Sequence, residues 1–272
     1  KIVQMKKDAI KSIKNASVKI AMESVTKLIK TSINKQLLEI YINRPDKMNA
    51  INPETSMELK HIFEQFKSND NLKVAILSGS GEKAFSAGND LKHIRSDSDP
   101  KVPFGGITSD YICYKPIIAA INGFALGGGL ELALSCDILI ASNKSTFGFP
   151  EPKVGLFAGA GGAAKLAKLI PQKLALSLLL TGKLINSIEA NNIGLISEIV
   201  PSKDILKRAR EIANEILKCS PLAISATKQI IYNEYPTDHD PGNIEKVYSE
   251  VIKLRNSNHF NIGKKAFTNK ED

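Results

Sequence analysis

The sequence has little that could cross-link the chain or hold a metal, with three cysteines and four histidines among 272 residues. Cys113, Cys136 and Cys219 are an odd number and lie far apart, without the close spacing of zinc ligands. The histidines are equally scattered. We therefore expect no disulfide framework and no metal site, and the free thiols favour a reducing compartment such as the cytoplasm.

No segment has the pattern of a membrane span or of a dinucleotide-binding turn. The longest apolar run, residues 117–134, is interrupted by Asn122, four glycines and Glu131. Residues 159–164 fit the spacing G-x-G-x-x-A, but prolines just before them exclude the preceding strand that a dinucleotide site requires. No serine lies in a G-x-S-x-G turn of the kind that serine hydrolases use. The sequence thus predicts neither a membrane partner nor a nucleotide cofactor.

Positive charge is concentrated at the N-terminus. The formal net charge is +9, and residues 1–36 contain nine lysines but only two acidic residues, Asp8 and Glu23. The rest of the chain is nearly neutral, so it lacks the dense basic face that non-specific nucleic-acid binding requires. Residues 1–21 form a basic extension, which we interpret as an added helix rather than a mitochondrial presequence because it contains no arginine. A presequence would place the protein in the mitochondrial matrix instead.

Hydrophobic periodicity predicts a core of strands and helices over residues 22–200 and a helical region over residues 201–272. Strands that alternate with helices form parallel crossovers, so the core is expected to be a layered α/β structure. The predicted strands are 37–41, 74–77, 117–121 and 138–141, and the predicted core helices are 53–67 and 128–136. The helical region contains patterns at 201–218, 221–235 and 243–256. Residues 96–106 form a proline- and glycine-rich loop that could act as a lid.

A run of three glycines at residues 127–129 opens the predicted helix that carries Glu131. The first N–H groups of a helix have no partner within it and lie at the positive end of its dipole, which suits a developing anion. Glu131 lies three residues after Gly128, on the same face of the helix. Glycines at a helix start can also serve close packing alone, and a glutamate in a first turn can simply favour the dipole.

A second candidate carboxyl is Glu151, which follows Phe147, Phe149 and Pro150. An apolar setting disfavours the charged form, so this carboxyl is expected to hold its proton more readily than in water. Two carboxyls at one site can differ in protonation, and one can then take a proton while the other gives one. Glu151 could instead be an ordinary surface residue after a proline.

Three stretches together resemble the crotonase, or enoyl-CoA hydratase/isomerase, superfamily: residues 84–92, 121–133 and 147–151. The resemblance extends from about Met22 to the C-terminus, and the turn at Asn43-Arg44-Pro45 supports it. It implies a spiral ββα core with a C-terminal helical trimerisation region. It also implies reversible syn addition of water to a 2-enoyl-CoA thioester, coenzyme A being part of the substrate rather than a separate cofactor, in a homotrimer or a dimer of trimers.

The resemblance assigns roles to individual residues of this chain. The oxyanion-hole donors would be the backbone N–H groups of Asn89 and Gly128. Glu131 and Glu151 match the paired glutamates of hydratases, and we expect Glu131 to activate water and Glu151 to protonate the α-carbon. The residues that would line the coenzyme A site are Lys47, Ala50, Ala87, Asp90, Leu91 and Lys92.

Departures from the family pattern leave alternatives open. Asn89 replaces a common alanine, Ala158 replaces a common proline, and residues 103–106 read Pro-Phe-Gly-Gly. These features resemble the branch that contains carnitinyl-CoA dehydratases, which hydrate crotonobetainyl-CoA. Isomerases of the superfamily often use one glutamate, so the presence of two favours hydration. An RNA-binding hydratase homologue is the alternative of another class, weakened because the basic segment lacks interleaved aromatic residues.

Overall fold

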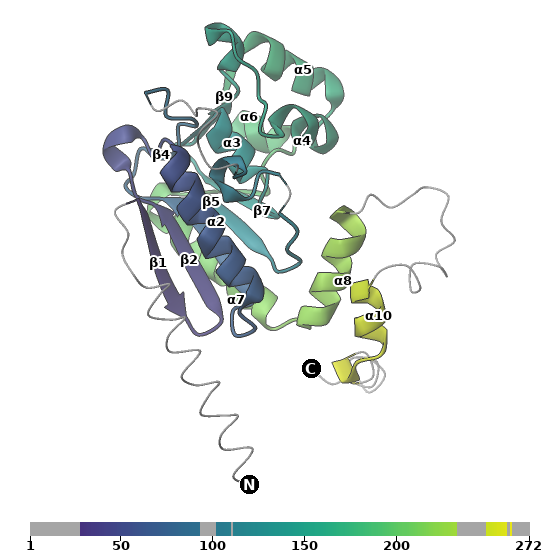
Figure 1. The fold of residues 1–272 in the computed structure, drawn as a ribbon. Helices are drawn as coiled ribbons and strands as arrows, with labels where there is room; N and C mark the ends of the chain where they lie inside the picture. The colour runs from purple at the N-terminus through teal and green to yellow at the C-terminus, as the bar shows by residue number, and fades with distance from the viewer. Residues whose placement is uncertain (1–27, 93–101, 110, 233–248, 260–261, 263–272) are drawn as a thin grey trace.

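The computed structural model describes residues 28–92, 102–109, 111–232, 249–259 and 262. The predicted basic extension at 1–21 and the first part of the predicted loop at 96–106 lie outside these ranges. Within them the chain forms two sheets with helices packed around them (Figure 1).

The larger sheet has six strands, in the order β1-β2-β3-β5-β7-β10. Its strands are β1 (Ile29–Asn34), β2 (Leu37–Ile42), β3 (Val74–Gly79), β5 (Ile117–Ile121), β7 (Ile138–Ser142) and β10 (Glu198–Val200). All neighbours are parallel except β1, which forms an antiparallel hairpin with β2. The sequence prediction missed β1, because its apolar residues are few and alternate with polar ones on a half-exposed edge.

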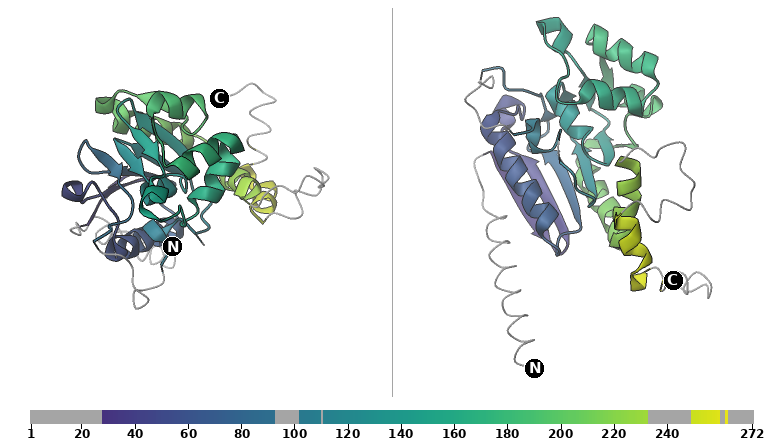
Figure 2. Two further views of the ribbon diagram at one scale, coloured as in Figure 1. Left: turned by 90° about the horizontal axis from the view of Figure 1, so that it is seen from above. Right: turned by 45° about the vertical axis from the view of Figure 1, so that its right-hand side comes forward.

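The smaller sheet has four strands, in the order β4-β6-β8-β9. They are β4 (Ala84–Ser86), β6 (Phe124–Leu126), β8 (Thr146–Gly148) and β9 (Leu184–Asn186). The chain places β3, β5 and β7 in the large sheet and the strand after each of them, β4, β6 and β8, in the small one. Each turn of the chain thus adds one strand to each sheet, and the chain winds as a spiral of strand pairs (Figure 2).

The described helices are η1 (Pro45–Lys47), α2 (Pro53–Ser68), η2 (Phe104–Gly106), α3 (Gly128–Ala133), η3 (Glu151–Val154), α4 (Gly162–Leu169), α5 (Gln172–Thr181), α6 (Ser187–Asn192), η4 (Ser202–Asp204), α7 (Ile205–Leu217), α8 (Pro221–Tyr232) and α10 (Ser249–Arg255). Among the described residues, α2, α7 and α8 are the longest helices. The predicted helix at 53–67 is confirmed: the Asn52 side chain accepts the Thr55 N–H at 3.0 Å and starts it. The predicted helix at 128–136 ends earlier, at Ala133.

The central strands of the large sheet are covered on both faces, so β3 and β5 are buried at every position and mostly apolar. Leu38, Leu77 and Ala119 face α2 and the main core. On the opposite face, Val74 and Ile118 lie in a second cluster with the apolar side of α7. This sandwich fixes β3, β5 and β7, after which the chain continues into β4, β6 and β8. The residues of the candidate site directly follow these three strands of the small sheet.

Helix α8 joins the core through a partly buried polar cluster around Asp137. Lys228 of α8 donates to Asp137 Oδ2 at 2.7 Å, and the backbone N–H of Ile117 donates to the same oxygen at 2.7 Å. The hydroxyl of Tyr232 donates to Asp137 Oδ1 at 2.6 Å. Side-chain exposures of 11% for Lys228 and 15% for Asp137 show that water screens this pair weakly.

Replacing Lys228 with methionine should lower the free energy of unfolding by about 3 kcal/mol, because Asp137 would stay poorly solvated without its cation. Urea unfolding of the Lys228→Met variant measures this. Lys183→Met is the matched control, since the Lys183–Glu189 pair is 58% and 43% exposed and should change stability by less than about 1 kcal/mol. Equal effects of the two substitutions would contradict the structural role given to Asp137.

Candidate functional site

Two backbone segments meet at the start of α3. Gly88 has a φ of +93°, and a Cβ on it would lie 3.0 Å from the Gly128 nitrogen and 2.7 Å from the Leu126 carbonyl oxygen. Glycine is therefore required at this position for its backbone conformation and for space. The close approach brings Asn89, the next residue, beside the first N–H groups of α3.

The backbone around Asn89 is oriented by a short parallel bridge to Ile51. The Ile51 N–H donates to the Gly88 carbonyl at 2.8 Å, and the Asp90 N–H donates to the Ile51 carbonyl at 3.0 Å. This pattern turns the N–H of Asn89 to the side away from Ile51. Neither that N–H nor the N–H of Gly128 has an acceptor among the residues that the structure describes. Both can therefore donate to a ligand, and their role as oxyanion-hole donors stays a prediction.

Glu131 lies one turn into α3 and is buried, with 3% of its surface exposed. Its Oε1 accepts the N–H of Gly162, the first residue of α4, at 2.8 Å. Burial raises the pKa of Glu131 above its ordinary value, the Gly162 N–H opposes that shift, and the nearby Glu151 carboxylate adds to it. The result is a carboxylate that is held by donors yet takes up a proton more readily than an exposed glutamate.

Glu151 is the first residue of η3, and its carboxyl also lies beside the start of α3. A Cβ on Gly127 would lie 2.6 Å from Glu151 Oε1, so the carboxyl rests directly against the backbone that precedes Gly128. Gly127 has a φ of +52°, which also favours glycine there. The other oxygen, Oε2, is buried and has no hydrogen-bond partner within the described ranges. Burial is the main cause that raises the pKa of Glu151.

The two carboxyls differ in their hydrogen bonds, and this difference separates their chemistry. Backbone N–H groups of Gly162 and Ala160 stabilise the ionised form of Glu131. Glu151 lacks a comparable set of donors, and an unpartnered buried oxygen favours the protonated form. The site therefore pairs a carboxyl suited to accept a proton with one suited to donate a proton.

The residues predicted to line the coenzyme A site gather on one side of this centre. The N–H of Ala87 donates to the Met48 carbonyl at 2.9 Å, which joins its segment to the turn that carries Lys47 and Ala50. Lys47 is exposed, and Ala50 is half-buried. Leu91 and Lys92 are both exposed. Their contact with coenzyme A stays a prediction.

Asp90 has a structural partner that sequence reasoning missed. Arg44 donates to Asp90 Oδ2 at 2.8 Å, and the two side chains are only 11% and 9% exposed. Arg44 also donates to the Ala50 carbonyl. This pair ties the turn at 44–50 to the segment that carries Asn89. The residues are 46 positions apart, so no local pattern in the sequence could indicate the contact.

A second group that the sequence analysis did not assign is the short η2 turn with Phe104. A Cβ on Gly128 would lie 2.5 Å from the ring of Phe104, so this ring covers the beginning of α3. The N–H of Gly105 donates to the Ser56 hydroxyl of α2 at 3.1 Å. Phe104 and Ser56 line a small cavity, together with Ile51, Asn52, Pro53, Asn89 and Val102.

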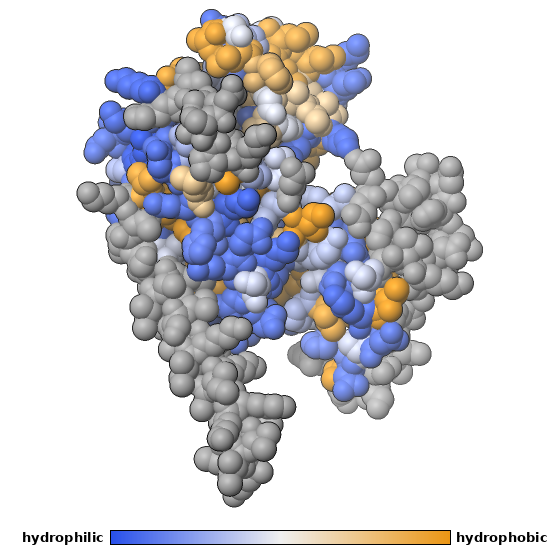
Figure 3. All heavy atoms as spheres, viewed as in Figure 1, coloured by the Kyte–Doolittle hydropathy of each residue, from blue (hydrophilic) through white to orange (hydrophobic). Residues whose placement is uncertain are grey.

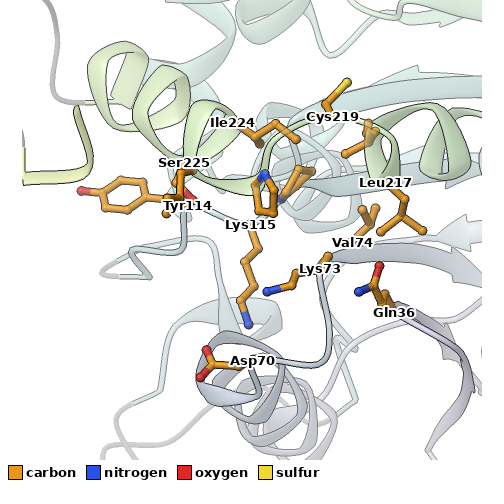
Figure 4. A pocket seen from close by; sticks show the side chains of 14 residues that line it. Gln36, Asp70, Lys73, Val74, Tyr114, Lys115, Leu217, Cys219, Ile224 and Ser225 are labelled. Carbon is orange, nitrogen blue, oxygen red and sulfur yellow. The ribbon is translucent and has the colours of Figure 1, made fainter. Parts of the chain in front are cut away.

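A larger cavity of about 300 Å³ lies elsewhere, where α7 leads into α8 (Figure 4). None of the carboxyl or amide groups above lines it. Lys115 extends from this cavity toward the end of α2, where its ammonium donates to the carbonyls of Phe66 and Asn69 at 2.7 and 2.9 Å. The ammonium there satisfies the last carbonyls of a helix, which gives Lys115 a structural role.

Metal-binding clusters and membrane-spanning helices are both absent from the described ranges. Those ranges contain no group of three or more His, Cys, Asp or Glu side chains that could hold a metal ion. In the same ranges no helix is both long and apolar enough to cross a membrane. Cys113, Cys136 and Cys219 are all free thiols.

The spiral of strand pairs and the paired carboxyls define a protein of the crotonase class. The chain belongs to the enoyl-CoA hydratase/isomerase family, whose model matches residues 32–272. It is 39% identical to a carnitinyl-CoA dehydratase of Escherichia coli K12 over 202 residues, which are 72% of this chain and 77% of that protein.

Solved structures agree with this membership. An enoyl-CoA hydratase from Mycobacterium tuberculosis H37Rv superposes with a TM-score of 0.81 and 34% identity, over 90% of this chain and 97% of that one. A carnitinyl-CoA hydratase from Mycobacterium avium superposes with a TM-score of 0.72 and 33% identity, over 91% of this chain and 97% of that one. The predicted α/β crotonase-like fold is confirmed.

The raised pKa of Glu131 predicts a pH-dependent effect on stability. An acid whose pKa is higher in the folded state than its ordinary 4.5 stabilises the fold below that pH, and this contribution is lost as the pH rises through the folded-state pKa. Glutamine never ionises and can still accept the Gly162 N–H. The Glu131→Gln variant should therefore melt at a higher temperature than wild type at neutral pH.

The gain should disappear below pH 4.5, where the wild-type carboxyl is also neutral. Thermal melts across this range measure it, with Glu64→Gln as the control because Glu64 is exposed on α2. If Glu131→Gln and wild type differ in melting temperature by the same amount at neutral pH and below pH 4.5, desolvation of Glu131 is not the cause of the difference.

Proposed function

We propose that the chain catalyses the reversible syn addition of water to the double bond of a 2-enoyl-CoA thioester. The observation that carries this proposal is the position of two carboxyls, the buried Glu131 and the half-buried Glu151, beside the N–H groups of Asn89 and Gly128, which have no acceptor within the described ranges. Membership of the enoyl-CoA hydratase/isomerase family supports it. No metal or separate organic cofactor enters the proposed reaction.

The two N–H groups would bind the thioester oxygen. Their donation withdraws electron density from the conjugated system, which makes the β-carbon electrophilic and stabilises the enolate that forms. Loss of one such donor typically costs about 3–4 kcal/mol of transition-state stabilisation. The donors are backbone groups held by the Ile51 bridge and by α3, so they need little reorganisation during the reaction.

The carboxyls would handle the two protons of the added water. Glu131, with its amide donors, takes a proton from water as the oxygen adds to the β-carbon. Glu151, with its unpartnered oxygen, gives its proton to the α-carbon of the enolate. Because both groups lie beside the same helix start, they address one face of the substrate, and this favours syn addition.

A narrower candidate is hydration of crotonobetainyl-CoA, or dehydration of carnitinyl-CoA in the reverse direction. The similarity to the carnitinyl-CoA dehydratase of Escherichia coli K12 favours it. The absorbance of the conjugated enoyl thioester, followed with crotonyl-CoA, longer enoyl-CoAs and crotonobetainyl-CoA, ranks these substrates. Double-bond migration without a 3-hydroxyacyl product would support the isomerase alternative instead.

The Glu131→Gln and Glu151→Gln variants should each lose at least about 100-fold in turnover while remaining folded, because each removes a positioned acid or base. Steady-state hydration rates and circular dichroism measure this. Glu64→Gln should retain wild-type turnover, since its side chain is exposed on α2. Near-normal turnover of either site variant would remove that glutamate from the mechanism.

We further propose that the protein assembles as a homotrimer or a dimer of trimers. Apolar side chains gather over α4, α5 and β9, at the top of Figure 3. We call this surface the apolar patch: Val154, Leu156, Phe157, Leu169, Leu174, Leu176, Leu180, Leu184 and Ile188. Phe157 and Leu180 are 80% and 72% exposed. Apolar surfaces of this extent usually mark a site of contact with another molecule.

Light scattering at micromolar concentration should give three or six times the mass of one chain, 29.6 kDa. The Leu180→Asp variant should shift the assembly toward smaller species, because it places a charge in the apolar patch. Lys173→Asp is the matched control, since Lys173 is exposed on the same helix. A monomeric wild-type protein would contradict the proposed assembly.

A further inference from the structure

Helix α4 begins beside the candidate base and contributes two residues with contacts around it. Its first residue, Gly162, donates its backbone N–H to Glu131 Oε1 at 2.8 Å. One turn later, Lys165 lies half-buried on the same helix. The first contact belongs to the site already described, whereas the second has no part in it so far.

Lys165 links two elements that surround the site. Its ammonium donates to the Ser135 hydroxyl at 2.6 Å, and that hydroxyl donates to the backbone carbonyl of Glu131 at 2.8 Å. The same ammonium donates to the Thr108 carbonyl at 2.9 Å. It therefore joins the end of α3 to the segment that follows η2.

Thr108 connects Lys165 to Phe104. Its hydroxyl donates to the Phe104 carbonyl at 2.7 Å, and Thr108 is 3% exposed. The ring of Phe104 in turn covers Gly128, whose N–H is one of the proposed oxyanion donors. A continuous chain of contacts thus runs from Lys165 to the space above that donor.

Lys165 also brings a positive charge close to Glu131. Burial lowers the pKa of Lys165, while the nearby charge of Glu131 opposes that shift. In return, Lys165 lowers the pKa of Glu131 against the effects of burial and of Glu151. Burial raises the pKa of the Cys136 thiol, which therefore stays neutral beside them.

We propose that Lys165 is a positioning residue that fastens the Phe104 turn over the Gly128 amide and places its positive charge near Glu131. The proposal rests on the hydratase function, because it assigns Lys165 a part in the same site. Lys165 acts through Thr108, Ser135 and Glu131, and no contact with substrate is required of it.

The Lys165→Met variant tests both effects, because methionine fills a similar volume without charge or donors. We expect turnover to fall by about 10- to 100-fold while KM changes far less, since a small misplacement near reacting groups has effects of this size. Without the nearby cation the pKa of Glu131 rises, so the acidic limb of the pH–rate profile should move to higher pH. Lys165→Arg, which keeps the charge, should have its acidic limb at the same pH as wild type.

Hydrogen exchange separates the positioning role from the reaction itself. In Lys165→Met the backbone amides of residues 102–109 should exchange at least about 10-fold faster, because the tie to α4 opens more often. Exchange in β3 and β5 should not change. Lys173→Met is the matched control and should behave as wild type in every measurement.

The inference is overturned if Lys165→Met shows the wild-type rate of hydrogen exchange at residues 102–109 and also keeps the acidic limb of its pH–rate profile at the wild-type pH. If Lys165→Met does not fold, Lys165→Arg decides: a displaced acidic limb in that charged variant would overturn it as well. A wild-type protein that hydrates none of the enoyl-CoA panel would refute the proposed function alone, and the exchange comparison would still decide whether Lys165 holds the Phe104 turn.

Discussion

The close packing of the Gly88 turn against the first residues of α3 is the constraint on which the site depends. A Cβ on Gly88 would come within 3.0 Å of the Gly128 nitrogen, and one on Gly127 would meet Glu151. Only backbones without side chains can approach this closely. The approach places two free N–H groups next to each other and leaves Glu151 against the same backbone. Glycine at these positions thus creates the space into which a thioester carbonyl would fit.

Burial of the carboxyls gives the site its chemistry and works against the stability of the fold. Glu131 is almost fully buried, and one oxygen of Glu151 has no partner within the described ranges. Desolvation raises both pKa values above the ordinary value of a glutamate. The surrounding structure must hold these groups in place against that cost. The Arg44–Asp90 pair, the Ile51 bridge and the first turn of α4 all contribute to this.

Local patterns in the sequence predicted much of the core and the reactive residues. The strand at 117–121 has the predicted bounds, and α2 begins where Asn52 and Pro53 indicated. Glu131 was accessible to sequence reasoning because three glycines and a helix start precede it. Arg44, Lys165 and Phe104 were not assigned roles, because their partners lie tens of residues away and only the folded chain brings them together. The split between Glu131 and Glu151 likewise acquired a physical basis only from their hydrogen bonds.

The central claim is that the N–H groups of Asn89 and Gly128 polarise a thioester carbonyl. The infrared stretching frequency of that carbonyl, in an isotope-labelled enoyl-CoA bound to the slow Glu131→Gln variant, measures this polarisation directly. Two donors aimed at the oxygen should lower the frequency relative to the free thioester in water, because they weaken the C=O double bond. A bound thioester with an unshifted carbonyl frequency would show that these amides do not form an oxyanion hole, and the account of the site would fail.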